Sequence, residues 1–79
     1  MIDDIDLYIK KLEERISNLR IQRKTSLYDF DVEFSSSEKR SEASNKIREY
    51  FSKLGCGVEI RMCKQCGNRK ADIILMWSL

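Results

Sequence analysis

The chain has 79 residues, of which 42% are hydrophobic and 35% are charged, with three cysteines and neither histidine nor proline. A chain of this length buries only about 60% of the surface that its unfolded form exposes, so we expect one small domain close to the lower limit of independent stability. Fifteen Lys and Arg against thirteen Asp and Glu leave a net charge of +2, which is too small to indicate a polyanionic partner.

The hydropathy of the chain argues against a membrane location. Its longest apolar run, residues 73–77, is far shorter than the roughly 20 residues that a membrane-spanning helix needs. The first residues also lack the basic and then apolar segments of a signal peptide. We therefore expect a cytoplasmic protein without a membrane partner.

The first predicted element is a helix over residues 3–24. Apolar residues recur there with alternating spacings of three and four, as in a heptad seam: Ile2, Ile5, Ile9, Leu12, Ile16 and Leu19. Carboxylates near its start and cations near its end suit the helix dipole. We favour the interpretation that this seam packs on the chain's own sheet. The alternative is that it forms a dimer or binds a groove on another protein.

A strand and a second helix follow. Aromatic or branched residues alternate with carboxylates over residues 27–34, which predicts a half-buried strand. Ser35 and Glu38 have the spacing of a capping box, which predicts the start of a helix over residues 36–54. We expect Gly55 to end this helix.

The last third of the chain predicts a hairpin with strands over residues 57–63 and 71–78. The turn signal lies between them, at 66–68. Pairing Met62 with Ala71 sets Ile60 opposite Ile73, and it sets Arg61 opposite Asp72 on the other face. One register therefore satisfies packing and charge together.

These elements predict a single α+β domain with the order α-β-α-β-β. The last strand is apolar on both faces, so we place it in the centre of a three-stranded mixed sheet, antiparallel to two outer strands that run parallel to each other. Both helices are expected on one face of the sheet. The other face is then left open.

Cys63 and Cys66 form a C-x-x-C-G motif, the spacing with which zinc ribbons hold a metal. A structural zinc needs four ligands, and Cys56 is expected at the far end of the hairpin, so a zinc-bridged dimer would need both cysteines from each of two chains. The alternatives are free thiols at a polar hairpin tip or a reversible disulfide. We interpret Cys56 as a small core residue.

Two charged sets are candidate binding surfaces. The first gathers hydroxyls and cations at the predicted helix start and hairpin tip, where they would form an edge that binds nucleic-acid phosphates: Ser36, Lys39, Arg40, Arg61, Lys64, Arg69 and Lys70. The second gathers carboxylates around two apolar residues on the open face of the sheet, where they would bind a protein partner: Asp29, Asp31, Glu33, Ile74 and Met76.

We expect no enzyme, because two helices on one face of so small a sheet leave little room for a catalytic pocket. The leading hypothesis is a small regulatory or accessory protein, of a type common in viral genomes, that binds nucleic-acid backbone. The alternative is an inhibitor or adaptor that binds a protein through its acidic face or the first-helix seam. A homodimer, with or without zinc, is the third expectation, and no other cofactor is expected.

Overall fold

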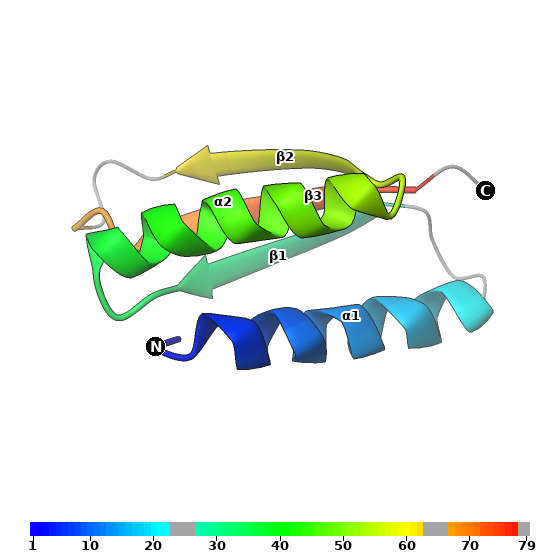
Figure 1. Cartoon of the computed structure of the whole chain (residues 1–79), viewed down its shortest axis with the longest axis horizontal. Helices are drawn as coiled ribbons and strands as arrows, with labels where there is room; N and C mark the ends of the chain where they lie inside the picture. Colours follow the sequence, from blue (N-terminus) through cyan, green and yellow to red (C-terminus); the bar gives the residue numbers. More distant parts are fainter. Residues whose placement is uncertain (23–26, 63–66, 78–79) are drawn as a thin grey trace.

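The computed structural model describes residues 1–22, 27–62 and 67–77. Along the chain lie α1 (Ile5–Ile21), β1 (Leu27–Glu33), α2 (Ser37–Lys53), β2 (Gly57–Met62) and β3 (Lys70–Met76). The predicted α-β-α-β-β order is confirmed. Both helices, however, begin later than predicted (Figure 1).

The start of α1 explains the first of these differences. Asp4 caps the helix by accepting a hydrogen bond from the Leu7 N–H at 3.1 Å. Ile2 therefore lies before the helix, in an extended segment that forms a short parallel bridge with Phe34. The first residue of the apparent seam belongs to the sheet's edge and not to the helix.

The cap of α2 also differs from the prediction, because Ser36 takes the place that the pattern gave to Ser35. Ser36 Oγ accepts a hydrogen bond from the Lys39 N–H at 3.1 Å. Ser35 instead donates its hydroxyl proton to Asp3 at 3.0 Å. A run of three serines offers several possible caps, and the bond to Asp3 is a tertiary contact that local spacing does not reveal.

Gly55 ends α2 as predicted. Its φ of +81° lies in the left-handed region, where a side chain is strained. The Gly55 N–H bonds the Ser52 carbonyl, and the Cys56 N–H bonds the Phe51 carbonyl, which is the Schellman arrangement. This turn sends the chain directly into β2.

β3 occupies the centre of the sheet, whose strand order is β1-β3-β2. Both of its ladders are antiparallel, so the sheet is antiparallel, and only the unpaired outer strands share a direction. The predicted hairpin register is confirmed, with Ile60 opposite Ile73 and Arg61 opposite Asp72. Gly67 and Asn68, within the predicted turn, both have a positive φ.

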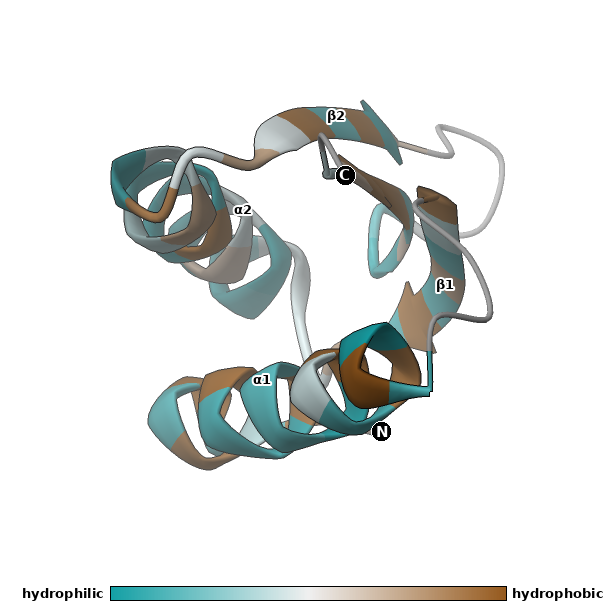
Figure 2. Ribbon diagram, turned by 90° about the vertical axis from the view of Figure 1, so that its right-hand side faces the viewer, coloured by the Kyte–Doolittle hydropathy of each residue, from teal (hydrophilic) through white to brown (hydrophobic). Residues whose placement is uncertain are grey.

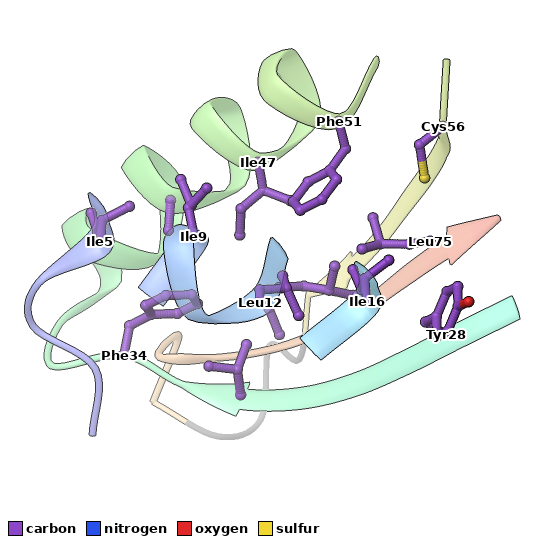
Figure 3. Packing of buried hydrophobic residues seen from close by; sticks show 14 residues of the cluster. Ile5, Ile9, Leu12, Ile16, Tyr28, Phe34, Ile47, Phe51, Cys56 and Leu75 are labelled. Atoms are coloured by element: carbon purple, nitrogen blue, oxygen red, sulfur yellow. The ribbon is translucent and has the colours of Figure 1, made fainter. Parts of the chain in front are cut away.

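Both helices cover one face of this sheet, as predicted (Figure 2). The helices and the inward side of each strand enclose the core, which Figure 3 shows from close by. Four residues of the α1 seam are buried in it: Ile5, Ile9, Leu12 and Ile16. The seam therefore packs inside the chain's own core, which is the interpretation that we favoured from the sequence.

Candidate functional site

The candidate site lies on the face of the sheet that the helices leave uncovered, which we call the open face. The ladder pairs arrange its residues in rows across the three strands. Asp29, Ile74 and Glu59 form one row, and Asp31, Asp72 and Arg61 form the next. Glu33 pairs with Lys70 in the row after these. The sheet thus brings together the carboxylates that were predicted from β1.

Three aspartates form the centre of this face. One carboxylate oxygen from each of Asp29, Asp31 and Asp72 lies within 4.8 Å of the other two. A hydrogen bond with the Asp29 carboxyl, partial loss of hydration and repulsion from Asp29 and Asp31 raise the pKa of Asp72 to about 6, while the charge on Arg61 opposes this rise. The cluster therefore carries an excess of negative charge near neutral pH.

Two cations lie beside these carboxylates. Arg61 Nε is 3.3 Å from Glu59 Oε1 on its own strand, and Lys70 Nζ is 3.9 Å from Glu33 Oε2 across the sheet. All four side chains remain substantially exposed, so these ion pairs contribute little to folding stability. They reduce the positive potential of the two cations.

The apolar residues of the open face differ in exposure. Ile74 is buried although it lies on this face, whereas Met76 and Leu27, which are paired in the ladder, are exposed. Near the other end of the face lies an open hollow of about 570 Å³, lined in part by Asp31, Asp72 and Arg61. Charged side chains from all three strands contribute to the wall of this hollow.

The described residues of the predicted phosphate edge have different surroundings. Arg40 is only 9% exposed and donates from Nη1 to the Lys70 carbonyl at 3.3 Å, so it joins α2 to the start of β3. Lys39 lines a hollow together with Asp3, Asp4, Asp6 and Glu42. Arg69 reaches the Met1 sulfur, and Ser36 serves as the helix cap.

The predicted zinc ligands Cys63 and Cys66, and the cation Lys64 between them, lie outside the described residues. Cys56 is buried in the core, as predicted, and burial raises the pKa of its thiol. It directly precedes Gly57, so it lies at the end of β2 away from Met62.

Sequence reasoning missed Asp72 as a member of the acidic cluster. The predicted register between β2 and β3 is correct, but it accounts for Asp72 only as the partner of Arg61. The predicted strand order already placed β1 beside β3, so its carboxylates had to flank Asp72 as well. Aligning β1 against β3 by their apolar residues would have revealed the contact with Asp31.

Comparisons with known proteins do not identify this fold or this face. No protein family matches the chain, and neither a curated protein nor a solved structure is similar to it. Neither helix in the described part of the chain has the length and apolar character needed to cross a membrane.

Proposed function

We propose that this protein is a small non-enzymatic regulatory or accessory protein that binds a basic segment of another protein through its open face. The observation that carries this proposal is the convergence of the Asp29, Asp31 and Asp72 carboxylates on a surface that no described element covers. Glu33 and Glu59 extend the negative charge along the two outer strands.

Electrostatic complementarity favours a cationic partner at such a face. Carboxylates held on a rigid sheet steer a positively charged segment toward the face and lose little conformational freedom when it binds. The exposed Met76 and Leu27 offer an apolar contact at one end of the face. A cation near Asp72 would also favour ionisation of that carboxyl, which otherwise protonates near pH 6.

Titration of a fluorescent oligolysine peptide into the protein at about 50 mM salt tests this proposal. We expect a micromolar dissociation constant that rises with salt. Asp31→Lys should weaken binding about tenfold or more. The matched control is Glu14→Lys, which makes the same charge change at an exposed position of α1 and should alter binding less than about threefold. If both variants lost the same affinity, the effect would depend on net charge alone, which would contradict the proposal.

Binding of nucleic-acid backbone is the second candidate. It is favoured by the exposure of Arg61 and Lys70, which lie near the same end of the open face. Affinity for duplex DNA and single-stranded RNA should then fall steeply with salt. The variant Lys70→Glu should remove most of it, and Lys10→Glu on α1 is the control. Absence of binding at about 50 mM salt would exclude this candidate.

A further inference from the structure

The outer edge of β2 carries backbone groups that no described element uses. The N–H and C=O of one strand residue point to the same side, and successive residues alternate. The Phe34 N–H bonds the Arg69 carbonyl. The backbone N–H and C=O groups of odd-numbered β3 residues therefore point toward β1, and those of even-numbered residues point toward β2. The register pairs those even-numbered residues with Gly57, Glu59 and Arg61.

The other three residues of β2 therefore present their backbone groups outward: Val58, Ile60 and Met62. Within residues 1–22, 27–62 and 67–77, no backbone or side-chain group bonds to these outward atoms. Figure 1 shows β2 as the outermost strand on its side of the molecule, with no labelled element beyond it. An edge strand in this state can accept another strand.

The sequence of β2 is complementary to itself when two copies pair antiparallel about an axis through Ile60. In this arrangement Ile60 faces its own symmetry mate, and Val58 faces Met62 of the second copy. The backbone groups of all three residues point outward from the sheet edge, so each of their N–H and C=O groups finds a partner in the second strand. A shift of one residue in this register would lose these bonds.

The side chains agree with the same axis. Glu59 of each copy lies opposite Arg61 of the other, in the non-hydrogen-bonded pairs, where facing side chains approach most closely. These two residues already form an ion pair within one strand. In the dimer each would keep a neighbour of opposite charge, which then belongs to the second copy. On the core side, the partly exposed Val58, Ile60 and Met62 would be covered by their counterparts.

We propose that this protein forms a homodimer in which the β2 strands of two copies pair antiparallel about Ile60 and create one continuous six-stranded sheet. The occupant of the open edge is thus a second copy of this chain. The contact is confined to one short strand from each copy, which places it among small, transient interfaces with dissociation constants of about 1–100 µM. The proposal is independent of what the open face binds.

Sedimentation velocity over this concentration range tests the dimer, and charge variants test its register. In Arg61→Glu, residues 59 and 61 are both acidic, and in Glu59→Arg they are both basic. Each variant alone opposes like charges across the axis, so its dimer should weaken about tenfold or more. Mixing the two should restore association as a heterodimer, because each acidic strand then faces a basic one.

Matched controls separate this register from other interfaces. Lys10→Glu alters the net charge as Arg61→Glu does, but on exposed α1, and should leave the dimer unchanged. Met62→Pro removes one outward N–H and should weaken the dimer more than Met62→Ala does, while circular dichroism remains that of a folded chain. A wild-type monomer throughout the range would overturn the proposal. So would a dimer that resists both charge variants, or variants that do not associate when mixed.

Discussion

The two edges of this sheet are treated in opposite ways. Along β1, the extended segment at Ile2 covers the end of the edge, because the Ile2 N–H bonds the Glu33 carbonyl at 2.8 Å and the Ser35 N–H bonds the Ile2 carbonyl at 2.9 Å. Farther along the same strand, the open-face residues Asp29 and Asp31 carry charges of one sign. Along β2, the outward groups are uncovered and the charges alternate in sign.

This difference shows that charge pattern, and not edge position alone, determines what a strand can pair with. Two β1 strands brought together antiparallel about their centre would oppose Asp29 with Asp31, and like charges in facing positions are destabilising. Two β2 strands in the same arrangement oppose Glu59 with Arg61. One edge is thus protected by a cover and by repulsion, while the other is suited to its own copy.

The largest expected effect on folding stability comes from truncating a core side chain next to each edge. Phe34 is fully buried beyond the end of β1 and contacts the Tyr8 ring edge-on at a centroid distance of 6.1 Å. We expect Phe34→Ala to lower the free energy of unfolding by about 3–5 kcal/mol. Ile60→Ala should cost less than this in dilute protein, because Ile60 on β2 is already partly exposed. Urea denaturation measures both, and equal losses would contradict the difference between the edges.

A smaller effect should follow from removing the cover of β1. Ile2→Pro eliminates the N–H that bonds Glu33, and we expect a loss of about 1–2 kcal/mol in the free energy of unfolding. Amide exchange at Ser35 should accelerate as its bond to Ile2 loosens. The control Ile2→Ala keeps the N–H, so it should retain slow exchange at Ser35. If both variants exchange alike, the bridge contributes nothing to covering the edge.

The smallest expected effect is a pH dependence at Asp72, which has the carboxylates of β1 on one side and Arg61 of β2 on the other. Its pKa of about 6 lies above the ordinary 3.8, so the folded chain binds the proton more tightly than the unfolded chain. Its contribution to stability is therefore present at low pH and is lost as the pH rises through about 6.

Thermal unfolding at about pH 5 and pH 7 measures this contribution. Asp72→Asn should flatten that part of the pH profile and stabilise the protein at the higher pH. Glu14→Gln removes one exposed carboxylate of α1 and should leave the slope unchanged. An unaltered slope in Asp72→Asn would show that Asp72 is not the group that titrates over this pH range.

The fold was accessible from the sequence because its patterns agree with one another. The period-2 pattern in residues 57–63 and 71–78 placed Ile60 opposite Ile73, and only one register also paired Arg61 with Asp72. The run of apolar residues on both faces of β3 identified the central strand, because only a strand with neighbours on both sides buries Ile73 and Ile74 together.

The site was less accessible because it depends on contacts between distant segments. Its place three residues before Ala43 and seven before Ile47 puts Arg40 on the inward face of α2, but its bond to the Lys70 carbonyl is a tertiary contact that this spacing does not reveal. The raised pKa of Asp72 likewise requires β1 to lie beside β3. Carboxylates on β1 were predicted correctly as a group, but their effect on a third strand was not.

The position of β3 also determines the order in which the molecule can assemble during synthesis. β1 and β2 share no ladder with each other, and each pairs only with the strand that is made last. Both helices and both outer strands are therefore synthesised before either ladder with β3 can form, and only the bridge between Ile2 and Phe34 can precede them. Until Lys70–Met76 emerges, β1 and β2 have no ladder to join, so the protection of their apolar sides in a nascent chain rests mainly on helix contacts.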